Sequence, residues 1–229
     1  MYSRSARFYD AIYGFKDYEA ECRRLVELVG PGGSLLDVAC GTGLHARQLT
    51  RSFQVTGVDL DSELLEVARA NVPQAQFLQA DMRSFDLGRT FRVVTCLFSS
   101  IAYVKTEQAL HSACACLARH LEPGGKLLVE PWLRREMLKP GHVGLDTAEC
   151  DGVRLARMST LEIVGELSVI HFHYLIGSAE GIVHETEDHE LALFTLEQYR
   201  QALEQAGLQV EFEPEGLCGR GLFTGVRVD

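Results

Sequence analysis

The chain has 229 residues, of which 46% are hydrophobic, and a formal net charge of -10 at pH 7. This length fits a single domain with a sizeable core, and the composition excludes a disordered chain. The acidic balance argues against nucleic acid as the main partner, because phosphate backbones need a basic face. No apolar run is long enough for a transmembrane helix, and the start of the chain lacks the apolar core of a signal peptide.

Seven cysteines are scattered along the chain without a CxxC pair. Their odd number and irregular spacing indicate reduced thiols, and we expect a cytoplasmic protein.

Apolar strands and amphipathic helices alternate over the first 132 residues. The spacing predicts helices over 17–29, 44–51, 61–70 and 106–120, and strands over 34–40, 54–61, 75–82, 91–100 and 126–132. Nearly continuous apolar strands joined by helices are typical of a parallel sheet that is covered on both faces.

The pattern changes after Trp132. Residues 133–150 look irregular, and three long β-like runs follow at 153–163, 166–176 and 181–194. Glycine-containing turns separate these runs, which predicts an antiparallel meander. A helix over 195–207 and two strands over 208–216 and 219–228 close the chain.

The segment Gly41 to Ala46 reads G-x-G-x-x-A between the first strand and the next helix. Glycines there allow a ligand to approach the backbone and the start of a helix. The same spacing occurs in dinucleotide sites, so a dehydrogenase is one interpretation.

Three acidic positions favour a different cofactor. Asp37 lies just before the turn, where it would repel a pyrophosphate and attract a cationic, amino-acid-like ligand. Asp59 ends the next strand and can accept two ribose hydroxyls. Asp81 and Met82 end the third strand, where an acid can bind an adenine amino group beside an apolar cover. The alternative is that these acids only cap helices.

Together DVACGTG, VDLD and ADM resemble the motif set of class I S-adenosylmethionine-dependent methyltransferases. The resemblance implies an α/β fold with a Rossmann-like seven-stranded sheet and an inserted antiparallel meander, and S-adenosylmethionine as the cofactor. The expected cofactor-binding residues are Tyr9, Asp37, Ala39, Gly41, Gly43, Asp59, Leu60, Asp81, Met82 and Phe98.

Further segments resemble the dTDP-amino-sugar N,N-dimethyltransferases that finish desosamine and mycaminose in antibiotic biosynthesis. They are GFKDY, DMRSFDLGRTF, CLFSSIAYV, HLEPGG, VEPW and GRGLFTGV. This resemblance spans nearly the whole chain and implies N-methylation, twice, of a nucleotide-linked amino sugar. It also implies a homodimer. From the charge and the lack of a long apolar run, we expect no nucleic acid or membrane partner. We expect one domain, with a lid and helix in 1–30, a cofactor-binding core in 34–132, a β insertion in 133–193, and a closing helix and hairpin in 194–229.

Methyl transfer to an amine requires mainly that a neutral amine is aimed at the methyl group and that water is excluded. Polar side chains that orient the amine should follow the fourth strand, where Ser99, Ser100 and Tyr103 lie. Some relatives have His at the position of Tyr103. Because a tyrosine with a pKa near ~10 is a poor base at neutral pH, we interpret Tyr103 as an orienting hydrogen-bond partner. Packing in the cleft is the alternative role.

Glu130 and Trp132 follow the fifth strand, where a carboxylate and an aromatic ring suit a sugar. The alternative for Glu130 is a helix cap or an ion pair exposed to solvent. The resemblance places Tyr2 and Tyr9 in the lid, with Tyr2 matching a residue that contacts substrate. It also matches Arg157 and Arg220 to arginines that contact the phosphates, a role that guanidinium groups suit.

His171, His173, His184 and His189 lie close together in sequence, but nothing completes a familiar metal site, and we expect no metal. Two other functions remain open. One is a methyltransferase for a different small amine or hydroxyl acceptor, and the other is a cofactor-binding protein without catalysis.

Overall fold

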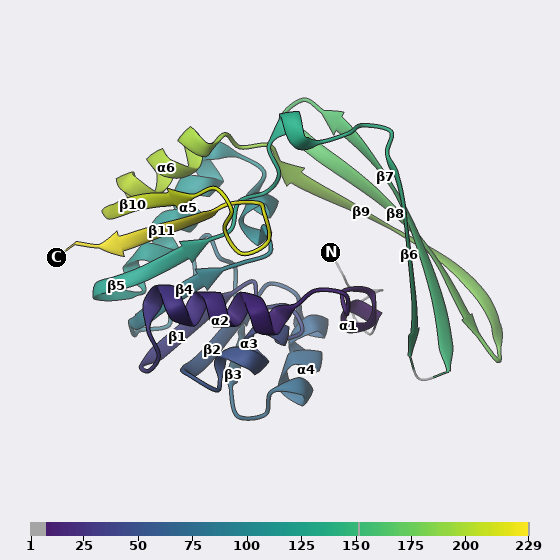
Figure 1. Ribbon diagram of the computed structural model, residues 1–229, viewed down its shortest axis with the longest axis horizontal. Helices are drawn as coiled ribbons and strands as arrows, with labels where there is room; N and C mark the ends of the chain where they lie inside the picture. The colour runs from purple at the N-terminus through teal and green to yellow at the C-terminus, as the bar shows by residue number, and fades with distance from the viewer. Residues whose placement is uncertain (1–7, 151, 229) are drawn as a thin grey trace.

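The computed structural model describes residues 8–150 and 152–228 as two β-sheets with flanking helices (Figure 1). The larger sheet has seven strands in the order β10-β11-β5-β4-β1-β2-β3. Its strands are β1 (Ser34–Val38), β2 (Gln54–Asp59), β3 (Gln76–Gln79), β4 (Phe91–Cys96), β5 (Leu121–Val129), β10 (Leu208–Glu213) and β11 (Leu222–Arg227).

The central strands of this sheet run parallel. β1 pairs in parallel with β2 and β4, β2 pairs with β3, and β4 pairs with β5. The closing strand β11 is antiparallel to both β5 and β10. The carboxyl ends of β1 to β4 therefore meet at one edge, where the loops that follow them come together.

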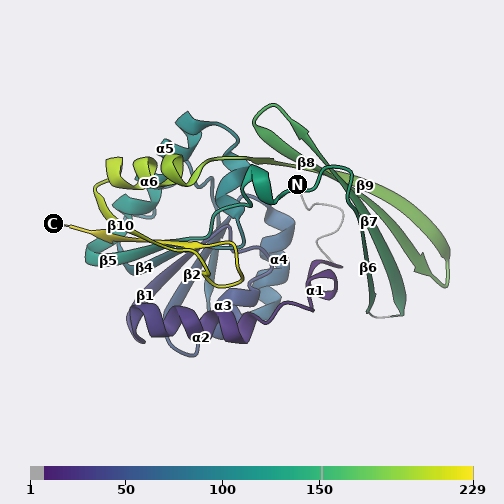
Figure 2. The same cartoon turned by 45° about the horizontal axis from the view of Figure 1, so that its top comes forward.

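Helices cover both faces of the seven-stranded sheet (Figure 2). They are α2 (Tyr18–Val29), α3 (Leu44–Leu49), α4 (Ser62–Asn71), α5 (Glu107–Arg119) and α6 (Leu196–Gln205). The short helix α1 (Tyr9–Ile12) packs instead against the second sheet, and η2 (Ser100–Val104) and η3 (Arg135–Met137) are short 3-10 helices. Side chains of α2, α3 and α4 form one core layer, and those of α5 and α6 form the other. None of the helices in the described part of the chain is long and apolar enough to cross a membrane.

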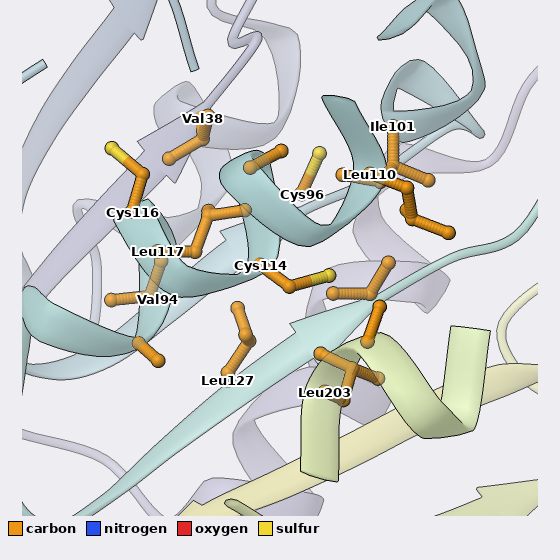
Figure 3. Packing of buried hydrophobic residues seen from close by; sticks show 14 of the residues in the cluster. Val38, Val94, Cys96, Ile101, Leu110, Cys114, Cys116, Leu117, Leu127 and Leu203 are labelled. Carbon is orange, nitrogen blue, oxygen red and sulfur yellow. The ribbon is translucent and has the colours of Figure 1, made fainter. Parts of the chain in front are cut away.

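Figure 3 shows the second layer, in which Leu110 and Leu117 of α5 and Leu203 of α6 pack over the sheet. Cys114 and Cys116 of α5 are buried in the same layer, and their thiols point in different directions. All seven cysteines are free, and the thiols of Cys96, Cys114 and Cys116 act as small apolar side chains in this core.

Short polar side chains cap the starts of α4 and α5. Asp61 accepts hydrogen bonds from the amides of Glu63 and Leu64 at the start of α4, and Thr106 accepts one from Ala109 at the start of α5. Such caps satisfy amides that have no partner within the helix.

The second sheet has four strands in the order β6-β7-β8-β9. They are β6 (Val143–Cys150), β7 (Val153–Val164), β8 (Leu167–Ser178) and β9 (Gly181–Ala192), and all neighbours are antiparallel. The α/β fold with a seven-stranded sheet and an added antiparallel meander is thus confirmed.

One expectation for this region is wrong, because residues 143–150 form β6 and are not irregular. The sequence VGLDTAEC includes Gly, Asp and Glu, which have low strand propensity. Pairing with β7 overrides that propensity, since Asp146 of β6 lies opposite Arg157 of β7 and forms an ion pair with it.

The expected strand over 91–100 is also shorter in the structure. β4 ends at Cys96, and the chain then turns through Phe98 and Ser99, both with positive φ, into η2. This turn redirects the chain over the edge of the sheet at which the carboxyl ends of the parallel strands meet.

Candidate active site

A cavity of about 600 Å³ lies at the carboxyl ends of the parallel strands. Among the residues expected to act, those that line it are Tyr9, Ala39, Gly41, Asp59, Leu60, Asp81, Met82 and Tyr103. Asp37, Gly43 and Phe98 do not line it. One cavity thus joins the glycine turn after β1 to Tyr103 on η2.

The glycine turn has a left-handed backbone that explains its residues. Ala39, Gly41 and Gly43 all have positive φ, at 57°, 55° and 79°. A Cβ on Gly43 would come within 3.3 Å of Ala68 on α4, so this glycine allows α3 and α4 to pack closely. Among the described residues, no atom other than those of its chain neighbours lies within 4 Å of a Cβ on Gly41, so the backbone there is open to a ligand in the cavity.

Asp59 holds this turn in place. Its Oδ2 accepts a hydrogen bond from the amide of Gly41 over 2.8 Å, and its Oδ1 accepts one from the amide of Asp61 over 3.0 Å. Burial raises the pKa of the carboxyl, although the two amides oppose this shift. Each oxygen keeps acceptor capacity for a ribose hydroxyl.

Asp37 on β1 is 2% exposed. Thr95 donates a hydrogen bond to its Oδ1 over 2.9 Å, and its Oδ2 has no hydrogen-bond partner within the described part of the chain. Burial raises the pKa of the carboxyl from 3.8 to about 6. A buried carboxylate oxygen that lacks a donor fits a cationic ammonium group as its partner.

Asp81 at the end of the third strand is engaged by a neighbour. Arg83 donates from Nε and Nη2 to its carboxylate, and these bonds lower the pKa of Asp81. Both residues line the cavity, and the ion pair is partly exposed, so an adenine amino group would share Asp81 with this arginine.

The turn after β4 is anchored by Glu130. The carboxylate is fully buried; its Oε2 accepts from the amide of Phe98 over 2.7 Å, and its Oε1 accepts from the thiol of Cys218 over 2.7 Å. Since both oxygens have partners inside the protein, this carboxylate secures the positive-φ turn at Phe98 and Ser99.

Arg220 belongs to the same cluster. Its Nη1 donates to Ser99 Oγ over 3.2 Å, and its guanidinium lies 4.9 Å from the ring centroid of Phe98 and 5.4 Å from that of Trp132. The Trp132 indole donates to Ser168 of β8 over 2.8 Å. The structure therefore brings Ser99, Glu130, Trp132 and Arg220 together beside the cavity edge formed by Ser100 and Tyr103.

Arg157 lies elsewhere, between α1 and the four-stranded sheet. It is 5% exposed; Nε and Nη2 donate to Asp146 over 3.0 and 2.7 Å, and Nη1 donates to the Tyr13 hydroxyl over 3.0 Å. The rings of Tyr13 and Phe172 flank the guanidinium. A phosphate would have to compete with Asp146 for this arginine.

Two groups of contacts near the cavity were not predicted from the sequence. Lys16 forms an ion pair with Glu21, whose carboxylate also contacts His45 over 2.9 Å, and Lys16 lies 4.9 Å over the Phe98 ring. His189, one of the four histidines that lie close together in the sequence of the meander, contacts Tyr103. The contact of Tyr103 with His189 has no sequence signal, because 86 residues separate the two. Tyr2 lies outside the described residues.

The other histidines of the meander pair with neighbours. His171 contacts Asp188 and Glu162, and His173 stacks on His184 with 3.0 Å between ring nitrogens. Within the described ranges, no three His, Cys, Asp or Glu side chains converge as metal ligands would. The absence of a metal stays a prediction.

Known proteins resemble both the sequence and this arrangement. Residues 35–125 match a methyltransferase domain family. The chain is 44% identical to dTDP-3-amino-3,6-dideoxy-alpha-D-glucopyranose N,N-dimethyltransferase of Streptomyces fradiae, over 96% of this chain and 90% of that protein. It is 41% identical to dTDP-3-amino-3,4,6-trideoxy-alpha-D-glucopyranose N,N-dimethyltransferase of Streptomyces venezuelae, over 96% and 97% of the two chains.

Solved structures agree over the full length. DesVI of Streptomyces venezuelae matches with a TM-score of 0.91 and 39% identity over 98% of both chains. S-adenosylmethionine-bound CalS10, an amino pentose methyltransferase from Micromonospora echinaspora, matches with a TM-score of 0.86 and 34% identity over 96% of both. Since the likeness covers the cofactor cavity, the turn after β4 and the four-stranded sheet alike, the chain belongs to the S-adenosylmethionine-dependent methyltransferases, in the family of the dTDP-amino-sugar N,N-dimethyltransferases.

Proposed function

We propose that this enzyme transfers methyl groups from S-adenosylmethionine to the amino group of a dTDP-linked amino sugar, twice, in the biosynthesis of an antibiotic. The observation that carries the proposal is the single cavity that joins the glycine turn and Asp59 to Tyr103. The names of the relatives supply the class of acceptor.

The residues at the turn fit the cofactor. Asp37 has an oxygen without a donor for an ammonium group, Gly41 leaves open space, and Asp59 can accept from ribose hydroxyls. When bound, S-adenosylmethionine supplies an electrophilic methyl group on a positively charged sulfur. In our proposal Tyr9, Leu60 and Met82 contribute apolar surface.

On the acceptor side, Tyr103 orients the amine from its place in the cavity wall. We propose that Arg220 binds the nucleotide diphosphate, since its guanidinium is only half-buried and its planar fork suits phosphate oxygens. Ser99 and Trp132 position that arginine. Glu130 acts indirectly, because its buried carboxylate holds the turn that carries Ser99.

Arg157 is proposed as a second ligand for the diphosphate, on the resemblance to relatives. The ion pair with Asp146 supports an alternative, structural role. In this role Arg157 joins the four-stranded sheet to α1 through its hydrogen bond to Tyr13. The two roles differ in what a substitution would change, the affinity for the sugar nucleotide or the stability of the fold.

We further propose a cytoplasmic homodimer. The seven free cysteines suit a reducing compartment. One face of the four-stranded sheet carries the exposed apolar side chains of Leu145, Met158, Leu175 and Ile182, and gathered exposed apolar side chains are typical of protein contacts. A second copy of the same sheet would bury it symmetrically.

The test is to incubate the pure enzyme with S-adenosylmethionine and a panel of dTDP-amino sugars, and to follow product mass. A gain of one and then two methyl groups on one sugar is the expected result. Binding of S-adenosylmethionine in calorimetry without any product would reject the amino-sugar acceptor and favour another small amine or hydroxyl.

A further inference from the structure

Tyr103 does not stand alone in the cavity wall. Its hydroxyl lies 2.6 Å from Nδ1 of His189, which is on β9 and 1% exposed. A ring nitrogen at this distance from a phenol shares a proton with it. The meander therefore reaches the acceptor side of the cavity through a buried imidazole.

A carboxylate continues this arrangement. Nε2 of His189 is 3.6 Å from Glu187 Oε2, and the side chain of Glu187 is 7% exposed. The hydroxyl of Tyr174 on β8 donates to the same oxygen over 3.3 Å. The ring of Phe172 packs edge-on against His189, with 5.1 Å between centroids, and shields it from water.

Other charged groups near this arrangement are already paired. Lys105, which directly follows η2, forms an ion pair with Glu190 of β9. On β8, His171 pairs with Asp188 of β9. From α1, the ring of Tyr9 lies in the same cavity wall as Tyr103. Glu187 is thus the carboxylate that faces His189 among the residues described.

We propose that His189 is a positioning residue for methyl transfer and acts through Tyr103 as a proton relay, with Glu187 as its counter-ion. The inference rests on the proposed function and deepens it. A tyrosine is a poor base near neutral pH, whereas an imidazole titrates in that range. The relay gives Tyr103 the basicity that a phenol lacks.

The proton balance is simple. An amino sugar that enters as an ammonium gives one proton to the Tyr103 oxygen, while the phenol proton passes to Nδ1 of His189. The ring becomes an imidazolium beside Glu187. The neutral amine then forms the new C–N bond as the C–S bond of the donor breaks, and the methylated product is again an ammonium. Release of the proton from His189 to solvent resets the relay for the second methyl group.

His189→Asn tests the relay, because an amide can still accept from Tyr103 but cannot take up a proton. We expect kcat near pH ~7 to fall about 100-fold, within the range for general acid–base catalysis. The loss should shrink as pH rises toward ~9, because more of the amine is neutral in solution. KM values and cofactor affinity should stay as in the wild type, and the monomethylated sugar should accumulate. The matched control is His184→Asn, because His184 is an exposed histidine on the same strand.

A wild-type pH profile of kcat for His189→Asn would overturn the relay. So would a loss that is equal at all pH values and accompanied by a lower melting temperature, since that indicates a structural role. Tyr103→Phe should match His189→Asn, and the double variant should lose no more than either one.

A second measurement separates failure of the relay from failure of the proposed function. If the wild type methylates no amino sugar, the function fails, and nitrogen-15 NMR of the His189 ring still decides the relay. A neutral ring with its proton on Nε2, changed by Tyr103→Phe, is the expected result. A proton on Nδ1 would exclude transfer from Tyr103.

Discussion

The amide of Gly41 donates a hydrogen bond to Oδ2 of Asp59 over 2.8 Å, and this bond joins the turn after β1 to the end of β2. Oδ1 of the same carboxylate accepts from Asp61 and so also holds the start of α4. One side chain thus shapes two walls of the cofactor cavity before any ligand binds. Preorganisation of this kind lowers the cost of binding.

Asp59→Asn should weaken binding of S-adenosylmethionine about 10- to 100-fold. The amide keeps one acceptor, so hydrogen bonds to a charged oxygen, worth about 1.5–3 kcal/mol each, are lost either at the turn or at the ribose. Titration calorimetry measures the dissociation constant directly. Asp188→Asn, an exposed carboxylate on β9, should bind as the wild type does. Equal affinity of Asp59→Asn and the control would remove Asp59 from the cofactor site.

Asp37 should make cofactor binding depend on pH. Its pKa is raised to about 6 by burial, so the carboxyl is ionised at pH 7 and protonated well below 6. A neutral acid attracts an ammonium group less, so we expect the affinity to fall as pH drops through about 6. Asp37→Asn should bind more weakly at pH 7 and lose this dependence. A wild-type affinity that stays constant between pH ~5 and ~7 would contradict this role.

The raised pKa of Asp37 has the opposite effect on the stability of the cofactor-free protein, which increases as pH falls. Because the folded-state pKa lies above the unfolded value of 3.8, the folded protein binds more protons between these two values. This group therefore adds stability as pH falls from about 6 to 4. Relative to Asp37→Asn, the wild type should gain about 2–3 kcal/mol over that range in urea unfolding.

The sequence was sufficient to predict the cofactor side of the fold. Strand periodicity places Asp37, Gly41 and Asp59 at the ends of neighbouring parallel strands, and their chemistry follows from that position. Their positions can be predicted without knowledge of long-range contacts, because each residue lies within a few residues of the end of its strand.

The contacts of the meander could not be predicted in that way. The pairing of Asp146 with Arg157 depends on an antiparallel register, and strand β6 has few residues of high strand propensity. The contact of Tyr103 with His189 depends on how β9 crosses η2. Such contacts are determined by packing between elements. The periodicity of residues along a single element carries no information about that packing.

Arg157→Ala should lower stability by about 2–4 kcal/mol, which corresponds to a fall in melting temperature of about 5–10 °C. The substitution leaves Asp146 and the Tyr13 hydroxyl without their partner and opens space between two rings. Calorimetric or fluorescence melting measures this. Arg154→Ala, an exposed arginine on the same strand that pairs with Glu149, should change stability by less than about 0.5 kcal/mol. An unchanged melting temperature with a raised KM would instead favour direct contact with the diphosphate.

Arg220→Lys should raise KM for the sugar nucleotide about 10- to 100-fold and change kcat only a few-fold. Lysine keeps the charge but loses the planar fork, the bond to Ser99 and the stacking on Phe98. Steady-state kinetics with saturating S-adenosylmethionine separates the two constants. Arg227→Lys, on β11, should leave both unchanged, since that arginine contacts the carbonyl of Leu121 at the start of β5. If KM for Arg220→Lys stays within two- to three-fold of the wild type, the phosphate contact must come from other residues.

Leu175→Glu should convert the proposed dimer into monomers. Leu175 is at the centre of the exposed apolar face, opposite Ala156 on one neighbouring strand and His184 on the other. A carboxylate there would be buried against its own copy in a symmetric interface, without a partner of opposite charge. Light scattering after size-exclusion chromatography gives the mass in solution. Val228→Glu also places a charge on an exposed apolar residue, but one that follows β11 of the seven-stranded sheet, and it should keep the wild-type mass. Monomeric wild-type protein at micromolar concentration would show that this face serves another purpose.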